Sequence, residues 1–377
     1  MLRQMVTART GSLTRFRALA VDRPLLAAIV GSRLIVLLAA WVGEQPALRN
    51  PALTSGSDLP ILRSLTAWDG WWYLGIARNG YHTAALTGGY HDYAFLPLFP
   101  AIIKALALPW PGADSLVSVL VSNALFVVGL VMMLQLGTIV LGDDRARWAV
   151  VLMALFPFSF VFSMAYAESL FLVLSVGALL AAERERRLLA GILVGLAALT
   201  RLQGAILALP VWLVLFLRDG RRLRSSQWPV LLGPASAGAF IVGISIFAGG
   251  AGAYGAAQAA WGRAGAGVAA AGQTLGAMLS PVTAIELVIL LAAVFLLVYL
   301  RADRLRLPYA ILPVLYLGLA FASGSLESIG RYVMLAFPNA WLIAGRRGAR
   351  VRPAWLALSA ILLFCFSVAA FAGRWVP

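Results

Sequence analysis

The sequence Ala67-Trp-Asp-Gly-Trp-Trp-Tyr-Leu-Gly-Ile-Ala-Arg-Asn-Gly-Tyr81 stands between two long apolar runs, and its continuation reads Tyr93-Ala-Phe-Leu-Pro-Leu-Phe-Pro100. It places one carboxylate, Asp69, among tryptophans and a tyrosine, in a chain that is otherwise largely hydrocarbon. Tryptophan and tyrosine are enriched where a membrane meets water. We therefore expect this stretch to lie at a membrane surface, with the apolar remainder of the chain packed around it.

The composition around this stretch is typical of a polytopic membrane protein. The mean hydropathy is +0.89, and 62% of the 377 residues are hydrophobic whereas 12% are charged, about half the charged share of a soluble domain. Backbone polar groups in lipid must be satisfied within helices or closed barrels, and these apolar runs are too continuous for barrel strands. The expected fold class is therefore all-α, with residues 1–377 forming a single integral-membrane domain.

The apolar runs predict about eleven crossings, if each span takes about 20 residues. They lie at 24–43, 116–141, 148–165, 169–182, 188–200, 204–217, 228–248, 282–300, 308–322, 332–345 and 353–372. The 44–115 segment is too long for a simple connection. Its part from 94 to 108 is interrupted by prolines, which predicts short helices at the membrane interface. A second long connection, 249–280, is rich in glycine and alanine.

The net charge of +15 comes almost entirely from arginines that fall in short clusters between the apolar runs. This distribution is a topology signal and not the basic patch of a nucleic-acid-binding protein, so we expect no nucleic-acid partner. The positive-inside rule places the clusters in the cytoplasm together with the N-terminus. They lie at 143–147, 183–187, 218–224, 301–306 and 346–352. The loops 44–115 and 249–280 then face the extracytoplasmic side.

The segment 188–217 leaves two topologies open, because Arg201 lies near its middle. A single helix would put arginine clusters on opposite sides of the membrane, whereas two short helices that meet at Arg201 keep the clusters on one side. We favour two helices. A charged side chain costs on the order of 2.5–3.5 kcal/mol at the centre of a membrane helix. We therefore expect Arg201 at an interface or in a water-filled cavity.

Asp69 has two interpretations. It can cap a short helix, with the neighbouring aromatic residues forming an interfacial belt. It can also be a general base, because such catalysis needs a carboxylate within hydrogen-bond reach of an incoming hydroxyl group. Aromatic faces such as those of Trp68 and Trp72 suit stacking on a sugar ring. The second interpretation is favoured because other polar residues between the spans fall on the same side of the predicted topology.

The other candidate binding residues are polar or aromatic side chains that the predicted topology places on this side of the membrane. They are Arg78, His91, Asp92, Tyr166, Glu168, Arg201, Gln203, Glu327 and Arg331. Each alone can also be a loop residue or half of a structural ion pair. Together they indicate one cavity that holds carboxylates and arginines, in which Arg201 and Arg331 suit the phosphate oxygens of a lipid at headgroup level.

The sequence favours a site without a cofactor. His82 and His91 are nine residues apart, without the close spacing of a metal motif, and the single cysteine, Cys365, lies inside an apolar run. The chain has neither a GxxxxGK[ST] loop nor a GxGxxG motif, which argues against nucleotide hydrolysis and favours a donor dissolved in the membrane. We therefore expect no cofactor and no metal.

The motifs Trp68-Asp-Gly, Tyr73-Leu-Gly-Ile-Ala and Asn79-Gly-Tyr81, followed by residues 94–100, resemble the PIG-V family of mannosyltransferases. The resemblance extends to residues 156–170, 195–204 and 330–332. It implies a GT-C fold, a polyprenyl-phosphate-mannose donor and a catalytic aspartate in the first large outer loop, here Asp69. It further implies that Glu168 shapes the donor or acceptor site and that Arg201 and Arg331 bind the donor phosphate.

The expected function is an inverting transfer of mannose from a β-linked donor to a hydroxyl group of a glycolipid, lipoglycan or secreted acceptor, which gives an α-mannoside. Donor class and stereochemistry follow from the resemblance, whereas the extracytoplasmic side of a bacterial plasma membrane follows from the charge pattern and the compact loops. Two other functions would use the same arginines. One is a transporter or flippase of a lipid-linked sugar, for which an internal repeat is typical; the other is a non-catalytic partner subunit of another transferase.

Overall fold

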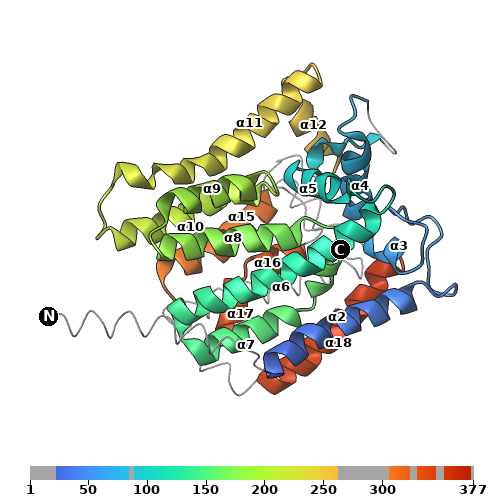
Figure 1. Cartoon of the computed structure of the whole chain (residues 1–377), viewed down its shortest axis with the longest axis horizontal. Helices are drawn as coiled ribbons and strands as arrows, with labels where there is room; N and C mark the ends of the chain where they lie inside the picture. Colours follow the sequence, from blue (N-terminus) through green and yellow to red (C-terminus); the bar gives the residue numbers. More distant parts are fainter. Residues whose placement is uncertain (1–22, 85–88, 262–304, 323–328, 345–351, 375–377) are drawn as a thin grey trace.

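The computed structural model describes residues 23–84, 89–261, 305–322, 329–344 and 352–374 (Figure 1). Within these ranges the regular structure is helical, apart from one isolated antiparallel bridge between Ser55 and Ala67. Four of the described helices are long and apolar enough to cross a membrane: Arg23–Gly43, Asp114–Leu141, Ser225–Phe247 and Pro353–Phe371. The chain is therefore a multi-pass membrane protein, and the predicted all-α class is confirmed.

The 44–115 segment folds into short helices between α2 (Arg23–Gly43) and α6 (Asp114–Leu141). These are α3 (Leu62–Leu65), α4 (Asp69–Asn79), η2 (Asp92–Ala94) and α5 (Leu98–Ala107). Helix α4 ends at Gly80, whose φ of 78° lies in the left-handed region that glycine adopts without steric cost. A short helix, α5, thus lies within the 94–108 part, and its place at the membrane interface stays a prediction.

The remaining described helices follow in chain order. They are α7 (Asp143–Ala154), η3 (Ser159–Ser163), α8 (Glu168–Glu183), α9 (Arg187–Ala198), α10 (Gln203–Arg218), η4 (Ser225–Leu231), α11 (Leu232–Phe247), α12 (Ala253–Ala260), α15 (Leu307–Ala322), α16 (Ile329–Leu335), α17 (Pro338–Ile343) and α18 (Arg352–Phe371). Because α9 ends at Ala198 and α10 begins at Gln203, the expectation of two helices that meet at Arg201 is confirmed.

Two predicted spans are broken in the structure. The 148–165 run is not one helix, because α7 ends at Ala154 and Pro157 disfavours a helical conformation of the residue before it. The 332–345 run is likewise split between α16 and α17, where Pro338 has no backbone N–H to continue the helix. The predicted 282–300 span lies outside the described residues.

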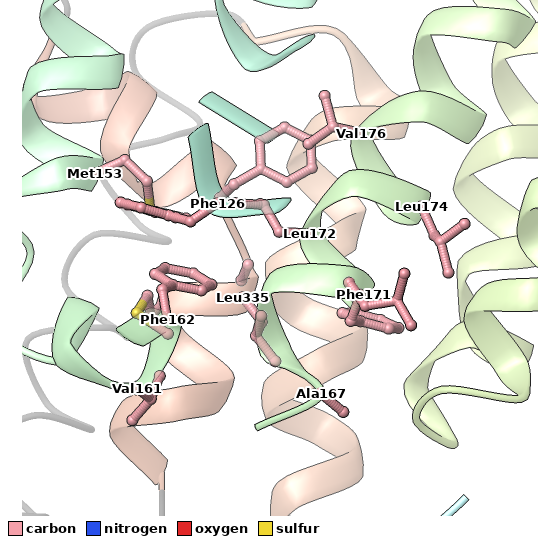
Figure 2. Packing of buried hydrophobic residues seen from close by; sticks show 14 of the residues in the cluster. Phe126, Met153, Val161, Phe162, Ala167, Phe171, Leu172, Leu174, Val176 and Leu335 are labelled. Carbon is pink, nitrogen blue, oxygen red and sulfur yellow. The ribbon is translucent and has the colours of Figure 1, made fainter. Parts of the chain in front are cut away.

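Helix α8 is the centre of the packing. Every residue of α8 except Val173 is buried, and Figure 2 shows Phe171, Leu172 and Val176 of this helix among side chains of neighbouring elements. Beside it, the rings of Phe126 and Phe162 stack with centroids 4.4 Å apart. Figure 1 shows α11 and α12 on one side of the molecule and the adjacent pair α2 and α18 on the other. Protein and not lipid therefore surrounds α8.

Protein contacts let α8 carry a charged residue at each end. At its C-terminal end the Glu183 carboxylate accepts a hydrogen bond from the Tyr309 hydroxyl at 2.8 Å and forms ion pairs with Arg306 at 2.9 Å and Arg218 at 3.5 Å. These contacts gather residues of three predicted arginine clusters, 183–187, 218–224 and 301–306. Glu168 lies at the N-terminal end.

The irregular segment between α7 and α8 is held by Arg33 of α2. The Arg33 guanidinium donates hydrogen bonds to the Ser159 carbonyl oxygen at 3.0 Å, the Ser159 hydroxyl at 2.7 Å and the Ser163 hydroxyl at 2.8 Å. It also lies 4.5 Å from the centroid of the Phe126 ring. Buried backbone outside a helix needs such partners, so the first span fixes the path of the chain toward Glu168.

The close approach of α9 and α10 depends on Gly204. A Cβ atom at this position would lie 2.2 Å from the backbone carbonyl carbon of Ala197. Because backbone atoms cannot move aside as a flexible side chain can, we expect Gly204→Ala to lower the free energy of unfolding by roughly 1–3 kcal/mol. Gly238→Ala in α11 is the control, since no atom lies within 4 Å of that site. Thermal unfolding in lipid nanodiscs measures both; equal midpoints would contradict the close packing.

Candidate active site

A cavity of about 250 Å³ opens between α4, the turn from α9 to α10, α12, α15 and α16. It is smaller than the roughly 300–1,000 Å³ of sites for drug-sized ligands, and it suits a group the size of one sugar ring. Its lining comprises Asp69, Tyr73, Ala94, Phe95, Leu96, Thr200, Arg201, Leu202, Gln203, Tyr254, Gln258, Leu319, Ala322, Arg331 and Tyr332. The charged residues of this described lining are Asp69, Arg201 and Arg331.

These charged residues form a buried ionic cluster with Glu168. Arg331 Nη1 donates to Asp69 Oδ2 at 2.5 Å and to Glu168 Oε1 at 3.1 Å, and Arg201 Nη1 donates to the same Glu168 oxygen at 2.5 Å. The Glu168 side chain is fully buried and that of Arg331 is 3% exposed, whereas those of Arg201 and Asp69 are 11% and 16% exposed. Two carboxylates balance two guanidinium groups, which is the condition for burying such charges.

The backbone before Asp69 is unusual. Trp68 has a φ of 57° and a ψ of −123°, in a region that non-glycine residues rarely adopt. Its indole Nε1 donates a hydrogen bond to the Ala370 carbonyl oxygen at 2.9 Å. Trp68 also occupies the N-cap position of α4, so the interpretation of Asp69 as the N-cap is wrong. Backbone outliers of this kind are concentrated at functional sites. Here the conformation of Trp68 sets the direction from which Asp69 enters the cavity.

Tyr166 lies behind both partners of the Asp69–Arg331 pair. Its hydroxyl accepts a hydrogen bond from the Asp69 backbone N–H at 3.3 Å, and the Arg331 guanidinium lies 5.5 Å from the centroid of its ring. That ring attracts a cation by its π electrons. Two residues further on, Glu168 begins α8, where the helix dipole favours a carboxylate. The short segment 166–168 thus supports both charges of the pair.

Arg201 and Gln203 lie where the sequence suggested. Arg201 is in the turn between α9 and α10 and lines the cavity, as expected for an arginine that avoids lipid. Gln203 is the first residue of α10, lines the same cavity and is 4% exposed. Within the described part of the chain, Glu168 Oε2 and Arg201 Nε have no hydrogen-bond partner. The cluster therefore retains polar atoms that a ligand can engage.

Three other predicted residues lie outside the cavity lining and have protein partners. Trp72 stacks on Phe95, with ring centroids 5.6 Å apart. Arg78 joins the end of α4 to the start of α6, through Asp114 at 2.5 Å and the Gly56 carbonyl oxygen at 2.8 Å. Trp68 makes the bond to α18 described above. Their contacts hold the aromatic segment in place.

His91 and Asp92 also lie outside the cavity lining. The His91 ring stacks on Tyr93, with centroids 4.9 Å apart. Asp92 Oδ2 accepts hydrogen bonds from the His82 backbone N–H at 3.1 Å and lies 2.9 Å from His82 Nδ1. Among the described residues, no group of three or more His, Cys, Asp or Glu side chains is arranged to hold a metal ion. Glu327 lies outside the described residues.

The sequence did not single out several residues of the cavity wall. Tyr73 and Phe95 belong to the aromatic segment itself, and burial is the largest influence that raises the pKa of the Tyr73 phenol, which therefore stays neutral. Tyr254 and Gln258 come from α12, within the Gly/Ala-rich 249–280 segment. The one signal for the latter two was a large polar side chain in a segment of small residues.

Comparison with known proteins shows a similarity that covers several of these residues. Residues 25–211, which include Asp69, Glu168 and Arg201, match the family described as mannosyltransferase (PIG-V). GPI alpha-1,6-mannosyltransferase 2 of Rattus norvegicus is 34% identical over 156 residues, 39% of this chain and 30% of that protein. The Mus musculus protein of the same name matches to the same extent. The match spans just under a third of the length of these curated relatives.

Two crystal structures of the Archaeoglobus fulgidus oligosaccharyltransferase are similar to this fold, with TM-scores of 0.45 and 0.44 at 15% and 14% sequence identity. They cover 89% and 93% of this chain, and 53% and 56% of their own chains. Fold and site together define an all-helical, multi-pass membrane protein with an ionic cavity between its helices. Within this class, the chain is similar over residues 25–211 to the PIG-V mannosyltransferases.

Removal of the Glu168 charge tests the ionic cluster. We expect Glu168→Gln to lower the free energy of unfolding by about 3–5 kcal/mol, because it leaves two buried guanidinium groups with one carboxylate. Asp114→Asn is the control: its ion pair with Arg78 is partly exposed, with side chains 17% and 42% exposed, so it contributes at most about 1 kcal/mol. Unfolding midpoints in nanodiscs report both; a Glu168→Gln protein as stable as Asp114→Asn would refute the cluster.

Proposed function

We propose that this membrane mannosyltransferase transfers mannose from a polyprenyl-phosphate-mannose donor to a hydroxyl group of a glycolipid or glycan acceptor. The observation that carries the proposal is the meeting of one carboxylate, Asp69, with two guanidinium groups, those of Arg201 and Arg331, in one cavity. A carboxylate can take the proton of an acceptor hydroxyl, and guanidinium groups bind phosphate oxygens. The similarity of residues 25–211 to the PIG-V mannosyltransferase family supports the sugar and the GT-C fold.

Asp69 acts as the general base in this proposal. The acceptor oxygen attacks the anomeric carbon and forms the new glycosidic bond, while its proton passes to the Asp69 carboxylate. The bond from the anomeric carbon to the phosphate oxygen breaks, and polyprenyl phosphate leaves with that electron pair. Attack on the face opposite the leaving group converts a β-linked donor into an α-mannoside. Because the phosphate leaves without a proton, no general acid is needed.

Arg201 and Arg331 hold the donor phosphate. This phosphate gains a negative charge as it leaves, so cations at fixed positions stabilise the transition state more than the bound donor. Glu168 is a positioning residue, since it lies outside the cavity lining and one of its oxygens accepts bonds from both arginines. The carboxylate thereby fixes the spacing of the two guanidinium groups.

The same geometry couples donor binding to the base. Arg331 is bonded to Asp69, so the base is paired with a group that the phosphate needs. When the phosphate takes Arg331 as its partner, Asp69 loses a positive neighbour, and its affinity for a proton rises. The base thus becomes effective once the donor is in place, which favours an order of binding with the donor first.

The membrane side and the acceptor class are part of the proposal. The charge pattern of the sequence favours an active site at the extracytoplasmic face of a bacterial plasma membrane. Three arginine clusters lie around Glu183, at the end of α8 remote from the cavity, which supports that assignment. At that face a membrane-dissolved donor meets glycolipids, lipoglycans and secreted glycans as acceptors.

Asp69→Asn separates the base from the donor site. Transfer of radiolabelled mannose from polyprenyl-phosphate-mannose should fall by about 10²–10⁴-fold, the range typical of a lost general base. Binding of sugar-free polyprenyl phosphate should become tighter than in wild type, because Arg331 no longer has Asp69 as a competing partner. Asp144→Asn, an exposed carboxylate at the start of α7, is the control.

Three results would contradict parts of this account. Retained transfer by Asp69→Asn would exclude Asp69 as the base. Unchanged affinity for polyprenyl phosphate would exclude the exchange of Arg331 between base and phosphate. Binding of the donor by wild type without transfer to any acceptor in a broad glycolipid panel would favour a transporter or a partner subunit.

Arg201→Lys tests the phosphate site. A lysine keeps the charge but cannot bind phosphate through a planar fork, so the Kd for polyprenyl phosphate should rise by roughly 10–100-fold, as for the loss of one hydrogen bond to a charged group. Arg222→Lys changes an exposed arginine and should bind like wild type. Calorimetric titration in nanodiscs measures both, and equal affinities would remove Arg201 from the site.

A further inference from the structure

The cavity contains uncharged polar residues that the transfer chemistry does not use. Asp69, Arg201 and Arg331 have roles as base and phosphate ligands, whereas Gln203, Gln258 and other neutral side chains of the lining do not. An amide side chain both donates and accepts hydrogen bonds, as a sugar hydroxyl group does. Two such amides in the lining of a cavity of about 250 Å³ therefore suit a ligand that carries hydroxyl groups.

Gln258 is held in a defined orientation by its own helix. Its Nε2 atom donates a hydrogen bond to the Tyr254 hydroxyl oxygen at 3.0 Å, one turn earlier on α12. Tyr254 is 9% exposed and packs with Tyr93 and Ile244 in a small apolar cluster between α11, α12 and η2. Because the bond uses an amide N–H, the amide oxygen of Gln258 stays an acceptor for a hydroxyl donor.

Gln203 faces the same space from the phosphate side. It lies two residues after Arg201, at the first position of α10, and lines the cavity. The rings of Tyr73 and Phe95 are also part of the lining. Aromatic rings suit the apolar face of a sugar, and amides suit its hydroxyl edge. The cavity thus offers both surfaces next to the guanidinium groups.

We propose that Gln203 and Gln258 bind the hydroxyl groups of the donor sugar, and that the site selects a sugar without a carboxylate group. The inference rests on the proposed function, since it takes the arginines as the phosphate site. A sugar with its own carboxylate group would bring a second negative charge into the cavity that Asp69 lines, which is unfavourable.

Gln258 lies outside the part of the chain that matches the family, which ends at residue 211. The base, one phosphate arginine and Gln203 lie inside it. The two amides therefore divide sugar recognition between the matched half of the chain and α12. A comparison limited to the matched half would identify the chemistry of the site and miss one of its two specificity residues.

The test compares two ligands that differ only in the sugar. We measure the Kd of polyprenyl-phosphate-mannose and of sugar-free polyprenyl phosphate, without acceptor, in nanodiscs. Gln258→Ala and Gln203→Ala should each lose roughly tenfold in affinity for the mannosylated ligand, as for one lost hydrogen bond, and none for the sugar-free ligand. Gln135→Ala, which removes an acceptor of Arg184 outside the cavity, should bind both ligands like wild type.

Donors that lack one hydroxyl group identify the contact. The donors to compare are the 2-, 3-, 4- and 6-deoxymannosyl compounds. On wild type, one of them should bind roughly tenfold more weakly than the complete donor. On Gln258→Ala, that same deoxy donor and the complete donor should bind with equal affinity. Equal losses in wild type and Gln258→Ala for every deoxy donor would overturn the proposal. So would a Gln258→Ala protein that loses affinity equally for both ligands, because this indicates a structural role. Since binding is measured without transfer, failure of the mannosyltransferase proposal is detected separately by the Asp69→Asn assay.

Discussion

One oxygen of Glu168 holds two guanidinium groups that come from separate parts of the chain. Arg201 arrives on the turn between α9 and α10, and Arg331 arrives on α16. Neither cation could be buried alone, because desolvation of an unpaired charge costs several kcal/mol. The fully buried carboxylate is itself tolerated because it begins α8, where the helix dipole and two cations favour it. The cavity therefore exists only when α8, the α9–α10 turn and α16 are assembled together.

The enclosure of α8 follows from the same constraint. A helix that carries Glu168 at one end and Glu183 at the other cannot face lipid, since each carboxylate needs arginines from other elements. Its apolar side chains consequently pack against protein on nearly all sides, as Figure 2 shows for Phe171 and Val176. Lipid contact is left to other helices, which expose large apolar residues such as Leu34 and Ile246.

Much of this arrangement could be predicted from the sequence. The apolar runs predicted the positions of α2, α6 and α18, because the thickness of the hydrocarbon layer fixes the length of a membrane-spanning helix. The cost of an arginine in lipid predicted the break at Arg201, and the gathering of Asp69, Glu168, Arg201 and Arg331 in one place follows from the expectation that buried charges pair. These predictions succeed because each depends on a large local energy.

Other features depend on partners that are remote in sequence, and the sequence did not indicate them. Arg78 was expected in the site, but Asp114 and the Gly56 carbonyl oxygen bind it elsewhere. Gln258 gave only the signal of a polar side chain in a segment of small residues, because its position depends on how α12 packs on η2. Trp68 was identified for its ring, whereas its bond to Ala370 joins residues 302 positions apart. At a synthesis rate of about 5–20 residues per second, the ribosome makes the Asp69 segment roughly 15–60 s before α18. During biogenesis Asp69, Glu168 and Arg201 are therefore inserted well before Arg331 arrives and before the last helix can fix the conformation of Trp68, and the competent site is one of the last parts of the molecule to form.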